Sequence, residues 1–175
     1  MHFKYDTKRE RFMGDVMGVL FLVILAVISY TDIRRRQIPN WCCVCIAALA
    51  VISDAVFFSA EIFDFKICQK LAFSEIFAVS LTERMLGALC VSVPMLGITV
   101  LAPGSFGGGD VKFMCAAGAL LGWRHILWSA AVGIFSAGVY VLYLLIIKNT
   151  GRKAEFPLGP FLCLGIAVNI LTEIY

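Results

Sequence analysis

Two aspartates stand where an ionised side chain is costly. Asp32 follows one uncharged apolar run, and Asp110 lies between a run of glycines and another apolar stretch. Ionisable groups at the ends of membrane helices are functional candidates unless they are paired or hydrated. When two carboxylates approach closely, one keeps its proton as an acid while the other activates a water molecule. The pair therefore predicts the acid–base hydrolysis of a peptide bond, as in aspartic proteases.

The glycine run before the second aspartate suits this chemistry. It consists of Gly107, Gly108 and Gly109. Glycine has no side chain to hold a substrate backbone away from Asp110, and it adopts backbone angles that other residues avoid. We expect this loop to bind the substrate next to the carboxylate.

The composition requires a membrane to position these residues. The chain has 175 residues, of which 61% are hydrophobic and 15% charged, and its mean hydropathy is +0.89. A soluble domain has roughly 45–50% apolar and about 25% charged residues. The net charge of +3 is small and scattered, which argues against a nucleic-acid partner. The expected fold is an all-α polytopic membrane helical bundle in contact with lipid.

The apolar runs predict about six transmembrane helices in a single membrane-embedded domain, 1–175. A basic segment before the first run also fits a signal peptide, but no small-residue cleavage site follows, so we expect an uncleaved helix. Residues 59–84 mix charged and apolar side chains, which indicates an amphipathic segment on the membrane surface. The expected spans are 12–32, 41–58, 85–102, 110–123, 126–147 and 156–173.

The connectivity places both aspartates on one membrane surface. Two spans separate Asp32 from Asp110, and an even number of crossings returns the chain to the same side. Counting lysine and arginine gives seven on this side and eight on the other, which decides nothing. Most of the opposing cations lie among carboxylates, so we favour a cytoplasmic position for the Arg34–Arg36 cluster.

Three segments resemble the signatures of the type IV prepilin peptidases, the bacterial GxGD membrane aspartic proteases. The resemblance implies that Asp32 and Asp110 are the catalytic dyad. It also implies that the glycine loop, Lys112 and the flanking prolines and asparagine bind substrate or shape the site. The three segments are Tyr30–Asp32 with Gln37–Asn40, Gly107–Lys112 and Phe156–Leu162, and the flanking residues are Pro39, Asn40, Pro157 and Pro160.

Members of this family remove the short basic leader of prepilins at the cytoplasmic face of the inner membrane, just before a hydrophobic helix. The resemblance therefore implies a prepilin-like protein substrate, a bacterial inner-membrane location and a site facing the cytoplasm, with no cofactor. Many members also carry paired CxxC motifs and methylate the new N-terminus. This chain lacks such a segment, so we expect peptidase activity alone, as in the similarly short enzymes of tight-adherence or Flp pili.

Each of these residues also has a structural interpretation. Asp32 could end the first helix as an interfacial charge, and Asp110 could be the N-cap of the fourth. Lys112 could be a snorkelling side chain, and Pro39 a helix-start residue. With these roles the chain would be a non-catalytic pilus-assembly subunit, or a small transporter or channel component.

The cysteines do not indicate a metal site or a disulfide framework. Six of the seven lie in apolar stretches, where cysteine behaves as a small buried hydrophobe. Cys42, Cys43 and Cys45 crowd one helical turn, but no second ligand cluster accompanies them. We therefore expect no metal.

Overall fold

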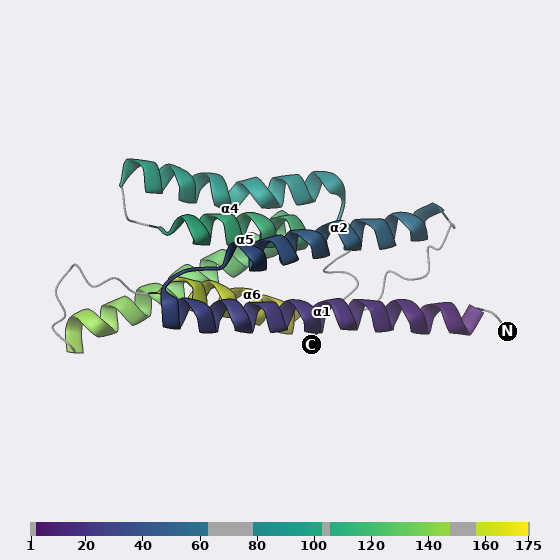
Figure 1. The fold of residues 1–175 in the computed structure, drawn as a ribbon, viewed down its shortest axis with the longest axis horizontal. Coiled ribbons are helices and arrows are strands. Elements are labelled where there is room, and N and C mark those ends of the chain that lie inside the picture. The colour runs from purple at the N-terminus through teal and green to yellow at the C-terminus, as the bar shows by residue number, and fades with distance from the viewer. Residues whose placement is uncertain (1–2, 63–78, 103–105, 148–156, 175) are drawn as a thin grey trace.

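The computed structural model describes residues 3–62, 79–102, 106–147 and 157–174, and within these ranges it is all-α (Figure 1). The expected all-α membrane bundle is confirmed. The described residues form the helices α1 (Phe3–Arg35), α2 (Asn40–Ile62), α4 (Leu81–Leu101), α5 (Gly108–Ile147) and α6 (Gly159–Ile174).

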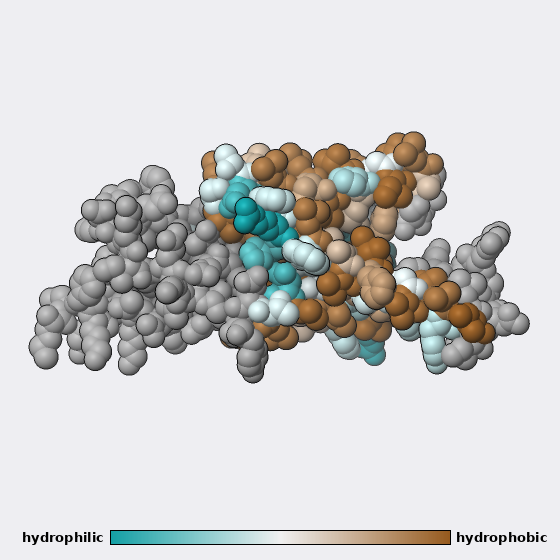
Figure 2. Space-filling view, turned by 180° about the vertical axis from the view of Figure 1, so that it is seen from behind, coloured by the Kyte–Doolittle hydropathy of each residue, from teal (hydrophilic) through white to brown (hydrophobic). Residues whose placement is uncertain are grey.

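Three stretches are long and apolar enough to cross a membrane: Val16–Arg35 in α1, Leu81–Leu101 in α4 and Gly108–Leu144 in α5. Shorter apolar helical stretches cover Asn40–Ser53 and Gly159–Thr172. Hydrophobic side chains cover most of the described surface on the face seen in Figure 2. Such a surface suits contact with lipid. The number of six crossings stays a prediction.

Helix α5 is broken at Gly122. This residue has φ 79° and ψ 171°, a left-handed φ that favours glycine. After the break the chain runs back beside α6, where the His125 ring bonds Asn169 and Gly133 packs against Leu162 (Figure 1). The expected spans 110–123 and 126–147 correspond to the two halves of this helix, although the break precedes the Arg124–His125 pair that suggested it.

Glycines allow the helices to approach closely. A Cβ on Gly87 of α4 or on Gly118 of α5 would overlap the backbone of the other helix, and a Cβ on Gly165 of α6 would overlap the backbone of α5 at Ser129. Lipid tails are as apolar as leucine, so helices in a membrane associate through close packing. The α4–α5 and α5–α6 contacts therefore depend on small residues.

A buried cation joins three helices at the break in α5. Arg84 of α4 is 3% exposed, although its sequence position suggested a surface charge. Its guanidinium donates to the Ser53 hydroxyl of α2 at 2.9 Å and to the Ala119 carbonyl of α5 at 3.1 Å. The Ala119 carbonyl lies in the last turn before the break at Gly122, and the carbonyls in the last turn of a helix need partners from outside the helix.

The expected surface segment 59–84 lies largely outside the described residues, which resume at Val79. Its two ends belong to helices, because α2 continues to Ile62 and α4 begins at Leu81. Ser80 caps α4 by accepting a hydrogen bond from the Glu83 amide at 3.4 Å.

Candidate active site

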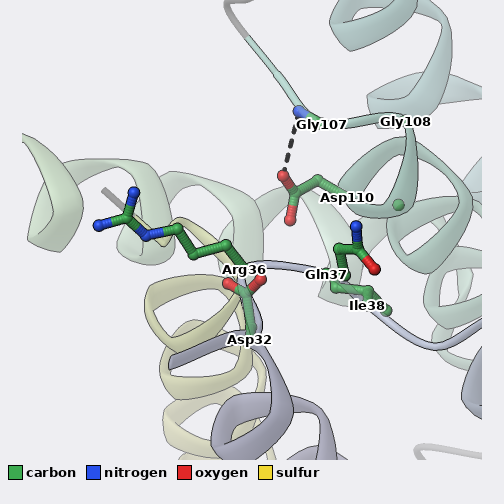
Figure 3. A pocket seen from close by; sticks show the side chains of 8 residues that line it. Asp32, Arg36, Gln37, Ile38, Gly107, Gly108 and Asp110 are labelled. Carbon is green, nitrogen blue, oxygen red and sulfur yellow. Dashed lines mark hydrogen bonds between the residues drawn. The ribbon is translucent and has the colours of Figure 1, made fainter. Parts of the chain in front are cut away.

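The C-terminal end of α1 and the N-terminal end of α5 enclose a pocket of about 260 Å³. The two aspartates and the glycine loop, which the sequence predicts to act together, all line this pocket (Figure 3). The remaining wall comes from the segment that joins α1 to α2. The lining residues are Asp32, Arg36, Gln37, Ile38, Gly107, Gly108, Gly109 and Asp110.

Asp32 lies in the last turn of α1 and is 6% exposed. Its Oδ2 accepts a hydrogen bond from the backbone amide of Gly159, the first residue of α6, at 2.9 Å. A negative charge is unfavourable at the C-terminal end of α1, whereas the N-terminal end of α6 favours it. Asp32 is therefore a buried group held by a second helix, and α1 continues past it to Arg35.

Asp110 is the third residue of α5, and its Oδ2 accepts a hydrogen bond from the amide of Gly107 at 3.3 Å. This bond is the half of a capping box in which the third side chain reaches back to the residue before the helix. Asp110 is therefore not the N-cap of this helix, which was the structural role suggested for it from the sequence. The other carboxylate oxygen lies on the side of the pocket facing Asp32 (Figure 3).

The three glycines of the loop have different surroundings. A Cβ on Gly107 would lie 3.0 Å from Oδ2 of Asp110, and a Cβ on Gly109 would lie 3.1 Å from Cβ of Ile38. Both distances are too short for an unperturbed side chain. A Cβ on Gly108 would meet nothing within 4 Å, so this residue leaves space for a ligand backbone.

The chain leaves α1 through a strained residue. Arg36 has a φ of 50°, the left-handed conformation, and its amide donates to the Asp32 carbonyl at 2.8 Å. For a residue other than glycine this conformation costs about 1–2 kcal/mol. The turn directs Gln37 and Ile38 along the pocket wall, while the Arg36 guanidinium extends away from both carboxylates (Figure 3). Such strain is often found at functional sites.

The other expected site residues lie near the pocket but do not line it. Lys112 is exposed on α5, and Asn40 is the exposed first residue of α2. Pro39 is partly buried, and its carbonyl accepts from the Cys42 amide at 3.0 Å. Pro157 precedes α6, and Pro160 is its second residue.

Sequence reasoning did not single out four residues that contact this site: Arg36, Gln37, Ile38 and Gly159. Two of them lie within the Gln37–Asn40 signature, so the signal was present but was assigned to the proline and asparagine. Gly159 lies between the two expected prolines. Nothing in the sequence indicates that its amide reaches a carboxylate 127 positions earlier.

The chemistry available in the pocket is that of two carboxylates beside an open glycine loop. Among the described residues, no three histidine, cysteine or acidic side chains group together as metal ligands would. The described cysteines are free thiols. Two carboxylates that share a site can divide the roles of general acid and general base.

Comparison with known proteins identifies the family. The model of the type IV leader peptidase family matches residues 19–142, more than two thirds of the chain, and this range contains both aspartates and the glycine loop. Neither a curated protein nor a solved structure matches the chain. Because the family model matches most of the chain, including the pocket residues, the chain belongs to the type IV leader peptidases, a family of proteases.

Proposed function

We propose that the chain is an aspartic endopeptidase with Asp32 and Asp110 as its dyad. The observation that carries the proposal is that both carboxylates line one pocket, together with the glycine loop. The two aspartates are 78 positions apart in the chain and come from the ends of two different apolar helices. Helix capping alone does not require two caps to face the same space.

The reaction needs no group beyond the two carboxyls and a water molecule. The ionised carboxylate accepts a proton from water as the water oxygen bonds to the peptide carbonyl carbon. The protonated carboxyl gives its proton to the carbonyl oxygen, which yields a tetrahedral diol. When the carbon–nitrogen bond breaks, the protonated carboxyl gives its proton to the leaving nitrogen and the other carboxylate takes a proton from a diol hydroxyl. The carboxyl pair then again holds one proton, as at the start.

The proposed substrate is a type IV prepilin-like protein with a short leader followed by a hydrophobic helix. A pocket at helix ends suits a bond that lies between a soluble leader and a membrane helix. The open space beside Gly108 suits a substrate backbone that passes close to Asp110.

We place the site at the cytoplasmic face of the bacterial inner membrane. Arg34, Arg35 and Arg36 are exposed at the end of α1 that carries the pocket. Cytoplasmic loops of membrane proteins carry an excess of lysine and arginine. We further propose that the enzyme does not methylate the new N-terminus, since the chain has no paired CxxC segment.

Co-expression with candidate prepilins tests the proposal. Asp32→Asn and Asp110→Asn keep the side-chain shape but remove the ionisable group, so leader removal should fall by at least about 10³-fold at equal membrane abundance. Glu83→Gln is the matched control, because it makes the same chemical change at the start of α4, outside the pocket lining. Cleavage that persists in either aspartate variant would favour the capping roles.

A further inference from the structure

We infer that the start of α6 positions Asp32 for reaction, and that Gly159 is the positioning residue. This inference rests on the proposed function, because it assigns a part in that reaction to a residue outside the pocket lining. Its basis is the buried hydrogen bond of 2.9 Å from the Gly159 amide to Oδ2 of Asp32. The bond fixes one carboxylate oxygen and so the direction of the other.

Only glycine fits at this position. A Cβ on residue 159 would lie 2.6 Å from Oδ2 of Asp32, 3.0 Å from its Cγ and 3.2 Å from its Cβ. The overlap is with the carboxylate side chain along its whole length. Even alanine must therefore turn or displace the side chain that the amide holds.

The neighbouring proline limits what α6 offers to Asp32. Pro160 has no N–H, and the Phe161 amide already donates to the Leu158 carbonyl at 3.1 Å. Of residues 159 to 161, Gly159 alone therefore presents an amide to the carboxylate. One bond holds Asp32 and leaves its second oxygen for water or substrate.

The electrostatic arrangement supports a role in catalysis. Asp32 lies at the C-terminal end of α1, where the partial negative charge of the helix opposes a carboxylate. The N-terminal end of α6 supplies the opposite partial charge at the same carboxylate. Thus α6 compensates a placement that α1 alone would disfavour.

Helix α6 is anchored separately from this contact. Gly165 packs against the α5 backbone at Ser129 and Gly133, and the His125 ring bonds Asn169 at 3.2 Å. Two glycines of one helix therefore have distinct surroundings. Gly159 meets a carboxylate, whereas Gly165 meets the backbone of a neighbouring helix.

The experiment compares glycine-to-alanine variants of the full chain in detergent micelles. For Gly159→Ala we expect kcat for leader removal to fall by about 10- to 100-fold, with KM within twofold and an unchanged Tm, because a misplacement of about 1 Å can cost 100-fold. Gly165→Ala should instead lower Tm and the yield of folded protein. Gly97→Ala should match wild type, because a Cβ there meets nothing within 4 Å.

A kcat for Gly159→Ala within threefold of wild type would overturn the inference, as would a fall in Tm that matches Gly165→Ala. Failure of the proposed function has a different signature, since Asp32→Asn and Asp110→Asn would then still cleave.

A spectrum of the glycine amides decides the same question without a substrate. In protein labelled with ¹⁵N-glycine, Gly159→Ala identifies the Gly159 resonance by its loss. Asp32→Asn should shift this resonance and leave that of Gly165 in place. An unmoved Gly159 resonance would show that no such bond exists.

Discussion

At the scale of single residues, the site depends on positions that carry no side chain. Gly107 and Gly159 donate their amides to the two aspartates, and each is so close to its carboxylate that a methyl group would meet it. Gly109 allows the start of α5 to lie against Ile38. The two carboxylates are thus oriented by backbone, which has little freedom to rearrange.

Alanine at the loop glycines should impair catalysis. In Gly107→Ala the new methyl pushes the Asp110 carboxylate, and in Gly109→Ala it pushes the start of α5 away from Ile38. We expect leader removal to fall by about 10- to 100-fold in each variant, measured as kcat in micelles. Gly138→Ala is the control, because a Cβ there meets nothing within 4 Å. Wild-type rates in both loop variants would contradict this account of the loop.

The sequence predicted part of this arrangement. The even number of predicted spans between Asp32 and Asp110 placed both on one membrane surface. In the structure both line one pocket. The Gly159 contact could not be predicted, because it depends on how α6 packs against α1. A short polar contact between segments so distant in the chain leaves no local pattern.

At the scale of the helices, Arg84 makes several polar contacts remote from the pocket. It joins α4 to α2 through Ser53 and to the first half of α5 through the Ala119 carbonyl. It also donates to the Val79 carbonyl at 3.1 Å. We infer that Arg84 stabilises the break at Gly122 and hence the direction in which the second half of α5 returns.

Removal of this side chain should cost stability and leave the chemistry intact. Arg84→Met leaves buried acceptors without their donor, so we expect unfolding to become easier by about 2–4 kcal/mol, measured by denaturation in mixed micelles. The folded fraction should keep the wild-type kcat.

Arg124→Met provides the comparison for that experiment. Arg124 is exposed and lies 5.3 Å from the ring centre of Trp123. An exposed contact of this kind contributes about 0.5–1 kcal/mol. Equal losses in the Arg84 and Arg124 variants would contradict the role given to Arg84.

The helix boundaries show what a sequence pattern can locate. Apolar length predicted two spans in the region of α5, and the charged Arg124–His125 pair suggested the position of the break. The actual break is at Gly122, whose left-handed conformation reverses the chain. Tertiary contacts set that conformation, since the residue packs against Val79 and Gly87.

At the scale of the whole molecule, the bundle has two different ends. The ends of α1 and α6 that meet at Asp32 lie with the start of α5, and this end carries the pocket. The other end of the bundle contains the break in α5 at Gly122, together with Arg84 and the His125–Asn169 bond. The pocket and the polar contacts of the Arg84 region are therefore separated along the long axis (Figure 1).

The proposed orientation can be tested by labelling from each side of the membrane. Arg35→Cys lies at the pocket end and Arg124→Cys at the turn of α5, and both native side chains are exposed. In a chain without other cysteines, an impermeant maleimide should label the first variant only in inside-out vesicles and the second only in right-side-out vesicles. The reverse pattern would place the pocket outside the cytoplasm.

Hydropathy alone could not fix the number of crossings. Helix α2 has 23 residues and helix α6 has 16, on either side of the roughly 20 residues that a perpendicular span needs. Neighbouring helices and local thinning of the bilayer can accommodate short spans. The all-α bundle followed from composition, whereas its depth in the membrane depends on contacts with lipid.

The most direct test of the central claim is a double-variant cycle on the two aspartates. If Asp32 and Asp110 act as one unit on one bond, Asp32→Asn, Asp110→Asn and the double variant should show the same residual kcat, because the second loss removes nothing further. Independent structural roles predict instead that the two losses multiply. Equal residual rates support the dyad, and a multiplied loss or surviving cleavage in either single variant contradicts it.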